Sequence, residues 1–265
     1  MIAHALTIAG SDSGGGAGIQ ADLKTFSALG AYGMSVLTAL TAQNTTGVSA
    51  VHPVPPEFVT AQIDAVFSDI RVDAVKLGML ATAPIIEAVA AGLARYEPAH
   101  VVLDTVMIAK GGHPLLASDA VSAIRERLLP LSSLITPNLP EAAALLECDV
   151  ATTEDEMRNQ GHALIAGGAR AVLMKGGHLG GAESPDWLIT AQSETRFANP
   201  RIATRNTHGT GCTLSAALAA LRPQHDNWED TVATARAWLQ AALKAADQLD
   251  VGHGIGPVHH FHAWW

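Results

Sequence analysis

Short apolar segments alternate with amphipathic segments along most of the chain. The apolar segments have the length of buried strands, and in the stretches between them hydrophobic residues recur at helical spacing. This pattern predicts strands at residues 5–9, 34–41, 74–80, 101–106, 134–138 and 171–174, and helices at residues 19–26, 59–67, 85–96, 121–128 and 154–165. Such alternation predicts an α/β fold, in which a mostly parallel sheet carries helices on both faces.

The last third of the chain follows a different pattern. Residues 186–190 and 195–202 are typical of shorter, antiparallel strands, and residues 232–249 follow helical spacing. The final segment, residues 258–265, contains three histidines and two tryptophans, but its spacing fits neither a zinc finger nor the H-E-x-x-H motif. We therefore expect this tail to dock onto the body of the protein or onto a partner subunit.

Size and composition favour one large domain that spans residues 1–265. The chain has 265 residues, of which 48% are hydrophobic and 15% charged, and it shows no repeat or long linker. The net charge of −9 and the absence of a Lys/Arg run argue against nucleic acid or an anionic membrane as a partner. The N-terminal residues do not resemble a secretory signal, and no apolar run approaches the ~20 residues of a membrane span, so we expect a cytoplasmic protein.

The segment from Asn206 to Leu221 is the strongest candidate for chemistry. A turn with glycines at Gly209 and Gly211, and Thr210 between them, leads into a strongly helix-forming sequence. Permissive backbone and the positive end of a helix dipole together predict an anion hole that suits phosphate. The same field would lower the pKa of Cys212, which makes its thiolate a candidate base or nucleophile. The alternative is a helix capped by Thr207 or Thr210, with an inert, buried cysteine.

Another glycine-rich loop, Gly10–Gly18, follows the first predicted strand and is called the first glycine loop below. Its spacing matches neither the Walker pattern nor the dinucleotide fingerprint, so we expect a loop whose backbone closes over another ligand. The strand predicted at residues 34–41 delivers Gln43 to the carboxyl end of the sheet, where open α/β sheets bind ligands. Gln43 is therefore a candidate for substrate recognition.

Further polar residues follow the predicted strands. Asp104 ends an apolar strand, where a carboxylate requires a metal, a donor or water, although it could also cap the next turn. Asn138 and Glu141 have the spacing of a capping box, which by itself accounts for both. Lys175 ends another strand and is a natural phosphate partner, and the loop Lys110–Pro114 is a candidate lid.

Four motifs together resemble the hydroxymethylpyrimidine/phosphomethylpyrimidine kinases of thiamine biosynthesis over the full length of the chain. They are Gly15–Asp22, Asn138–Glu141, Leu173–His178 and Gly209–Thr213. The resemblance implies a ribokinase-like fold, a three-layer α/β/α sandwich. It also implies an ATP- and Mg²⁺-dependent enzyme, a homodimer, that phosphorylates 4-amino-5-hydroxymethyl-2-methylpyrimidine and then the resulting monophosphate. One departure is visible, because Ser13-Gly14 stands where the family usually has Pro-Ser, which is expected to loosen the first loop.

The resemblance also implies roles for individual residues. The backbone N–H groups of Gly209, Thr210, Gly211 and Cys212 would bind the transferring phosphoryl group. Lys175 would add a charge on the ATP phosphates, and the Cys212 thiolate would take the hydroxymethyl proton. The expected Mg²⁺ residues, acting mainly through water, are Glu141, Asn138 and Asp104. The expected pyrimidine contacts are Gln43, Gly10, Asp22, Met79 and Val106.

Three other functions remain open at this point. A pyridoxal or pyridoxine kinase would use the same fold, because its acceptor is also a hydroxymethyl group on a flat nitrogen heterocycle. Cys212 and His208 could form the dyad of a thiol hydrolase, although no third orienting group is evident. A catalytically silent pyrimidine sensor would not need Lys175 and Glu141.

Overall fold

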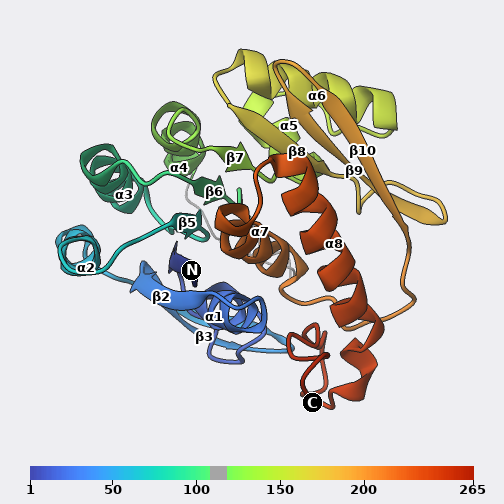
Figure 1. Ribbon diagram of the computed structural model, residues 1–265, viewed down its shortest axis with the longest axis horizontal. Coiled ribbons are helices and arrows are strands. Elements are labelled where there is room, and N and C mark those ends of the chain that lie inside the picture. The colour runs from blue at the N-terminus through green and yellow to red at the C-terminus, as the bar shows by residue number, and fades with distance from the viewer. Residues whose placement is uncertain (108–117) are drawn as a thin grey trace.

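The computed structural model describes residues 1–107 and 118–265. Within these residues, a central sheet lies between two layers of helices (Figure 1). The strands of this sheet are β1 (His4–Ala9), β2 (Tyr32–Leu37), β5 (Ala74–Leu77), β6 (Val101–Leu103), β7 (Leu134–Ile135), β8 (Ala171–Lys175), β9 (Glu183–Thr190) and β10 (Glu194–Pro200). The helices are α1 (Gly18–Ala28), α2 (Pro56–Phe67), α3 (Ala83–Tyr96), α4 (Ser118–Ala123), α5 (Leu139–Leu146), α6 (Glu154–Ala166), α7 (Thr210–Leu221) and α8 (Trp228–Lys244).

The strand order in the described part of the chain is β10-β9-β8-β7-β6-β5-β1-β2. Neighbouring strands from β2 to β8 are parallel, whereas β9 and β10 are antiparallel to their neighbours. The predicted α/β class with a mostly parallel sheet is confirmed, and so are the antiparallel strands near residues 186–202. No helix in residues 1–107 or 118–265 is both long and apolar enough to cross a membrane.

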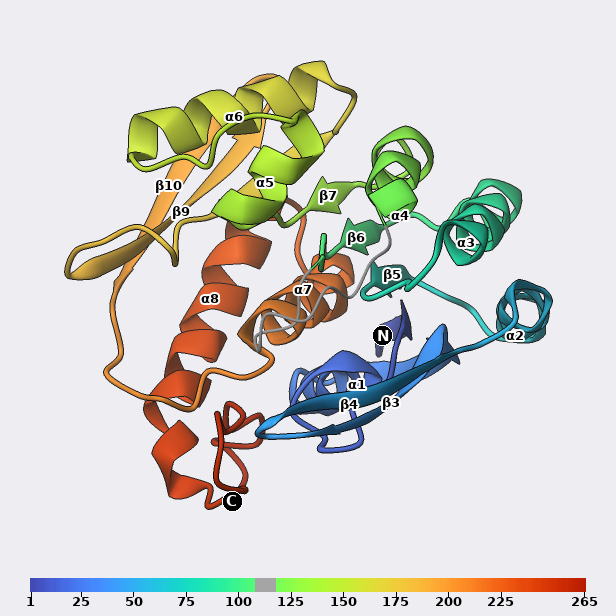
Figure 2. The same cartoon turned by 180° about the vertical axis from the view of Figure 1, so that it is seen from behind.

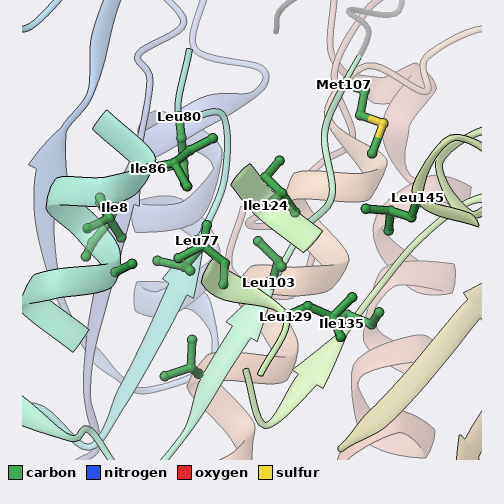
Figure 3. Close-up of a cluster of buried hydrophobic side chains, with 14 of the residues drawn as sticks. Ile8, Leu77, Leu80, Ile86, Leu103, Met107, Ile124, Leu129, Ile135 and Leu145 are labelled. Atoms are coloured by element: carbon green, nitrogen blue, oxygen red, sulfur yellow. The ribbon is translucent and has the colours of Figure 1, made fainter. Parts of the chain in front are cut away.

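Alternate side chains of the strands fill two separate hydrophobic cores. In β8, Val172 and Met174 belong to the core under α2, α3, α5 and α6, whereas Ala171 and Leu173 belong to the core under α1, α7 and α8. Figure 3 shows the first core, in which residues of neighbouring strands, such as Leu77, meet side chains of the covering helices. This period of two is what a sheet covered on both faces requires.

Helix α7 belongs to the layer formed by α1, α7 and α8, and it is buried from Thr213 to Leu221. Many of its buried side chains are alanines, and alanines such as Ala5 and Ala74 belong to the same core. Small side chains allow a helix to approach a sheet closely. The start of α7 is therefore held by packing along the whole helix.

One predicted strand is wrong. The pattern predicts a single strand over residues 34–41, but β2 ends at Leu37 and the chain turns away at Thr38. The Thr38 hydroxyl donates to the carbonyl oxygen of Met79 at 2.6 Å, and its N–H donates to Ala9 O at 3.1 Å, so this residue is fixed between two neighbouring strands. The next residues form β3 (Ala39–Asn44), which pairs with β4 (Gly47–Pro53) in a separate two-stranded sheet (Figure 2).

The C-terminal tail docks through its histidines, not its tryptophans. His259 and His260 are buried, whereas Trp264 and Trp265 are 70% and 72% exposed. His260 Nε2 lies 3.0 Å from the hydroxyl of Thr213 in α7, and burial lowers the pKa of His260 to about 3. The tail therefore packs a neutral histidine against the first turn of α7.

A buried ion pair links α1 to the sheet. Lys76 of β5 lies 2.9 and 3.0 Å from the carboxylate oxygens of Asp22, and both side chains are 0% exposed. The hydroxyl of Thr7 in β1 donates to the same carboxylate at 2.6 Å. Burial alone would lower the pKa of Lys76, but the charges of Asp22 and Asp104 raise it above its usual value. Lys76 is therefore a buried cation that depends on Asp22.

The substitution Asp22→Asn leaves the Lys76 cation without its countercharge and is expected to lower the free energy of unfolding by about 3–5 kcal/mol. Urea denaturation at pH 7 measures the change. The matched control is Glu87→Gln, which breaks an exposed ion pair with Arg127 and should cost less than about 1 kcal/mol. Equal effects of the two substitutions would contradict the structural role assigned to Asp22.

Candidate active site

A cavity of about 1190 Å³ opens at the carboxyl ends of the parallel strands. Its wall includes Gly10 after β1, Met79 after β5, Asp104 after β6, Asn138 after β7 and Gly177 after β8. This edge is the usual position of ligand sites in open α/β sheets. The fold therefore places the polar residues that follow the strands around one cavity.

With one exception, the site residues expected from the sequence line this cavity. Those that line it are Gln43, Gly10, Met79, Val106, Asp104, Asn138, Glu141, Lys175, Gly209, Thr210, Gly211 and Cys212. The exception is Asp22, which is fully buried and uses its carboxylate to hold Lys76 and Thr7. The expected direct contact of Asp22 with a substrate is therefore corrected, and Lys76 lines the cavity in its place.

The start of α7 is free of side-chain capping. The N-cap residue is Gly209, no side chain of residues 1–107 or 118–265 caps the first turn, and this turn contains no acidic residue. Capping by Thr207 or Thr210 is thus not observed; the Thr210 hydroxyl instead donates to Thr207 O at 3.2 Å. The dipole of α7 and the N–H groups of its first turn form a site at the cavity wall that favours an anion.

Gly209 has a specific backbone requirement. Its φ is +75°, in the left-handed region that favours glycine, and a Cβ there would overlap the carbonyl oxygen of Gly16. The two glycine segments of the sequence, residues 10–18 and 206–212, are therefore in direct contact at this point.

The thiol of Cys212 is protonated in this structure's environment, contrary to the sequence prediction. Burial raises its pKa to about 11, and Asp104 and Asp22 add to this effect. Lys76 and a hydrogen bond from the backbone of Gly18 oppose it but do not outweigh it. The helix start alone predicts a lowered pKa, and that prediction is wrong because the loss of water on burial dominates, with the two carboxylates adding to it.

Lys175 and two carboxylates form a charged cluster next to the start of α7. Its Nζ atom lies 3.3 Å from Asp104 Oδ1 and 3.9 Å from Glu141 Oε2. A Cβ on Gly211 would lie 3.5 Å from Lys175 Nζ and 3.9 Å from both Asp104 oxygens. Burial alone would lower the pKa of Lys175, but Asp104 and Glu141 raise it. A cation and two carboxylates thus border the anion site.

Asn138 and Glu141 form the capping box that their spacing predicts. The Asn138 side chain accepts from Glu141 N at 2.9 Å, and Glu141 Oε2 accepts from Asn138 N at 2.9 Å and from the Thr105 hydroxyl at 2.9 Å. Burial and the charge of Asp104 raise the pKa of Glu141, and Lys175 acts in the opposite direction. Glu141 Oε2 and the Asn138 side-chain oxygen are therefore already engaged, whereas Glu141 Oε1 accepts no hydrogen bond from the described part of the chain.

Asp104 supplies an oxygen that suits a divalent cation. Its Oδ2 atom is buried and has no hydrogen-bond partner among the described residues. Such an oxygen is costly unless a cation, a donor or a water satisfies it. In the described parts of the chain, no group of three or more His, Cys, Asp or Glu side chains could hold a metal by itself. This donor set fits Mg²⁺, which usually keeps several of its waters and uses one or two carboxylates.

The cavity lining also includes a mixed set of polar and apolar residues. Gly10 packs so closely on Met79 that a Cβ would overlap Met79 Cε, and Val106 lies on the same cavity wall. Gln43 reaches the cavity from β3 rather than from the end of a central strand, because the chain turns at Thr38. The loop Lys110–Pro114, a candidate lid in the sequence, lies outside the described residues.

Sequence reasoning missed the residue that joins the two glycine segments, Asp12. Its carboxylate accepts N–H bonds from Gly14 at 2.8 Å, Gly16 at 3.1 Å and Ala17 at 2.8 Å, and it lies 2.8 Å from His208 Nε2. Burial acts to raise the pKa of Asp12, but the bonds from His208 and the backbone lower it overall. An aspartate immediately before a glycine loop is typical of such turns, and this was the available signal.

This geometry corrects two further expectations. The dyad hypothesis needs His208 to activate Cys212, but His208 Nε2 faces Asp12. Ser13, expected to loosen the first loop, ties it to β3, because its hydroxyl accepts from Gln43 N at 2.8 Å and lies 2.8 Å from Gln43 O.

An ion pair that the sequence did not reveal supports the turn after Lys175. Asp186 of β9 forms an ion pair with Arg236 of α8, and its Oδ1 accepts from Gly176 N at 3.0 Å. Both Asp186 and Arg236 are mostly buried and line the cavity. The turn that carries Lys175 is thus fixed from the α8 side.

Known proteins share these features over nearly the whole chain. The family described as phosphomethylpyrimidine kinase matches residues 12–259. The hydroxymethylpyrimidine/phosphomethylpyrimidine kinase of Escherichia coli (strain K12) is 67% identical over 262 residues, which are 99% of this chain and 98% of that protein.

Solved structures agree with this match. An ADP complex of Bacillus subtilis pyridoxal kinase aligns with a TM-score of 0.91 and 37% identity over 99% of both chains. The phosphomethylpyrimidine kinase of Clostridium difficile 630 aligns with a TM-score of 0.82 and 42% identity, over 91% of this chain and 100% of that one. On this evidence of sequence, fold and cavity, the chain belongs to the phosphomethylpyrimidine kinase family.

Proposed function

We propose that this protein transfers the γ-phosphoryl group of ATP to 4-amino-5-hydroxymethyl-2-methylpyrimidine and then phosphorylates the monophosphate to the diphosphate, as a step in thiamine biosynthesis. The observation that carries the proposal is one cavity whose lining combines two chemically different sets of residues. The start of α7, Lys175 and Asp104 suit phosphate, and Gln43, Met79 and Val106 suit a flat heterocycle. The name of the relative that is 67% identical supports the choice of substrate.

The start of α7, with Lys175 and Asp104 beside it, suits phosphoryl transfer. This reaction needs in-line positioning and charge neutralisation more than covalent chemistry. The N–H groups from Gly209 to Cys212 would hold the equatorial phosphoryl oxygens as they gain charge, and Lys175 would neutralise part of the ATP phosphate charge. A similar protein, the pyridoxal kinase of Bacillus subtilis, is known as an ADP complex, which supports a nucleotide in this fold.

Mg²⁺ fits the carboxylates beside this anion site. Asp104 Oδ2 and Glu141 Oε1 would hold the ion, mainly through its waters, while Asn138 holds Glu141 in place through the capping box. When bound there, the ion would neutralise charge on the ATP phosphates.

We further propose that residues 1–265 act as one kinase domain, in the cytoplasm, and that two chains form a homodimer. The β3–β4 hairpin supports the dimer, because β4 is exposed from Ser49 to Pro53 and an isolated two-stranded sheet is only marginally stable. Sedimentation velocity would show a species of twice the chain mass.

A pyridoxal kinase is the second candidate. Pyridoxal kinases of Bacillus subtilis and Staphylococcus aureus both align with a TM-score of 0.91. Phosphorus NMR of the enzyme with ATP, Mg²⁺ and either acceptor separates the two functions. The proposal predicts the pyrimidine monophosphate followed by the diphosphate. Phosphorylation of pyridoxal alone, or of neither acceptor, would contradict it.

Gln43→Leu tests recognition of the pyrimidine. A carboxamide pairs an acceptor and a donor with an amino group and the adjacent ring nitrogen, and such a bidentate pair contributes ~1–3 kcal/mol. The KM for the pyrimidine should rise roughly 10- to 100-fold, with little change in the KM for ATP. Steady-state kinetics gives both values, and the exposed control Gln192→Leu should change neither. An unchanged pyrimidine KM in Gln43→Leu would remove Gln43 from the pocket.

Glu141→Gln separates a metal role from a capping role. Glutamine can still accept the bond from Asn138 N, so helix α5 should lose less than about 1 kcal/mol of stability. We expect turnover to fall and to recover partly at high Mg²⁺, as measured by kcat over a Mg²⁺ titration. Glu156→Gln is the control, because Glu156 also accepts from a residue before a helix, Thr152, but lies outside the cavity. Full activity of Glu141→Gln at low Mg²⁺ would leave only the capping role.

Cys212→Ala tests the base, because only the first acceptor must lose a proton as it attacks. The variant keeps the backbone N–H and should slow the first phosphorylation by about 10²- to 10⁴-fold and the second far less. Since the thiol pKa is raised to about 11, the thiolate fraction increases with pH up to that value. The rate of the wild-type first step should therefore rise with pH above neutrality.

The pH dependence should be lost in Cys212→Ala and kept in the control Cys148→Ala, which removes an exposed thiol outside the cavity. Single-turnover rates of each step from pH 6.5 to about 9.5 provide the comparison. If alanine at residue 212 slowed both steps equally, the base role would be abandoned.

A further inference from the structure

His208 lies between a carboxylate and the amide expected to read the substrate. Its Nε2 atom is 2.8 Å from Asp12 Oδ2 and 3.4 Å from the amide nitrogen of Gln43. The side chains of His208 and Asp12 are 15% and 3% exposed, so little solvent reaches the contact between them. Both His208 and Gln43 line the cavity. His208 is therefore placed to influence the orientation of the Gln43 side chain.

The proton on His208 Nε2 is fixed by its partner. Burial acts to raise the pKa of Asp12, but the bonds from His208, Gly14 and Ala17 lower it overall, so the group is a carboxylate at neutral pH. A carboxylate only accepts hydrogen bonds. At 2.8 Å, His208 Nε2 must therefore carry a proton and donate it.

This proton selects one of the two orientations of the Gln43 carboxamide. A protonated Nε2 has no lone pair, so an amide nitrogen facing it would bring two donors together, whereas an amide oxygen could share the proton given to Asp12 as a second, longer acceptor. As the structure gives it, the amide nitrogen faces His208 and the amide oxygen Oε1 lies 3.3 Å from the hydroxyl of Thr41, which also lies 2.9 Å from Ser11 O. When the Thr41 hydroxyl donates to Ser11 O, its oxygen can accept from an amide nitrogen. The reversed orientation, with oxygen toward His208 and nitrogen toward Thr41, therefore satisfies both contacts.

We propose that His208, held by Asp12, is a positioning residue that fixes the orientation of the Gln43 carboxamide and thereby sets which heterocycles the site accepts. The inference rests on the proposed function, in which Gln43 pairs with the edge of the acceptor. After both contacts are made, the amide oxygen keeps one lone pair and the nitrogen keeps one proton. The cavity therefore presents an acceptor on the His208 side of the amide and a donor on the Thr41 side.

A 4-aminopyrimidine complements this arrangement, because its amino group donates and the adjacent ring nitrogen accepts. The corresponding 4-oxo compound has the reverse pattern, since its oxygen accepts and its ring N–H donates. Turning the oxo compound over would restore the pattern but would move the 5-hydroxymethyl group away from the anion site. A fixed amide should therefore favour the amino compound, and a freely rotating amide should not.

The experiment compares kcat/KM for the 4-amino compound and for 5-hydroxymethyl-2-methylpyrimidin-4-one. The wild type should favour the amino compound by about 10- to 100-fold, as expected for one bidentate pair. His208→Met removes the donor and should lower this ratio at least about tenfold. His208→Gln, of similar size, keeps an N–H donor at the place of Nε2 and should retain the ratio within about threefold. A general loss of structure would lower both rates together and leave the ratio unchanged.

A retained ratio in His208→Met would overturn the inference while leaving the proposed function intact. Nitrogen-15 NMR of the wild-type imidazoles gives a readout that does not depend on activity, with the His208 signals assigned by their loss in His208→Gln. A proton bonded to Nε2 of His208 is expected, and an unprotonated Nε2 would overturn the inference. If the wild type phosphorylated neither pyrimidine, the proposed function would fail, and the nitrogen spectrum would still decide the state of His208. The exposed histidine of β4 provides the control His52→Gln, which should change neither readout.

Discussion

The Asp12 carboxylate is the interaction on which the architecture of the site depends. It binds three backbone N–H groups of the first glycine loop and the ring of His208, which directly precedes Gly209. Residues 12 and 208 are far apart in the sequence, and this bond brings the loop after β1 against the start of α7. A carboxylate with this many donors is held in its ionised form, so the link persists at neutral pH. The residues around Gln43 and the anion site at the start of α7 line one cavity because these two segments are joined.

The charges around the anion site are arranged as compensating pairs. Lys76 is held by Asp22, and Lys175 lies between Asp104 and Glu141, so each buried cation has a carboxylate within about 4 Å. The unmatched atom in this arrangement is Asp104 Oδ2, which has no partner in the described part of the chain. Burial is the main cause of the raised pKa of Cys212, and Asp104 and Asp22 add to it, so the site that favours a cation also keeps the thiol protonated.

Local patterns predicted the features that depend on local chemistry. Period and length located most helices and strands, and the spacing of Asn138 and Glu141 predicted their capping box. The features that failed depend on contacts between distant segments. The break at Thr38 is imposed by carbonyl groups of Met79 and Ala9, and the burial of Asp22 depends on Lys76. The raised pKa of Cys212 likewise results from burial by the surrounding fold, with additions from Asp104 and Asp22, which no pattern around residue 212 could reveal.

The most direct test of this account is a double-mutant cycle between Asp12 and His208. The free energy of unfolding would be measured by urea denaturation at pH 7 for the wild type, Asp12→Ala, His208→Ala and the double variant. A hydrogen bond to a charged group predicts a coupling energy of about 1.5–3 kcal/mol. Effects that add to within about 0.5 kcal/mol would show that the two segments are not joined by this bond and would contradict the account.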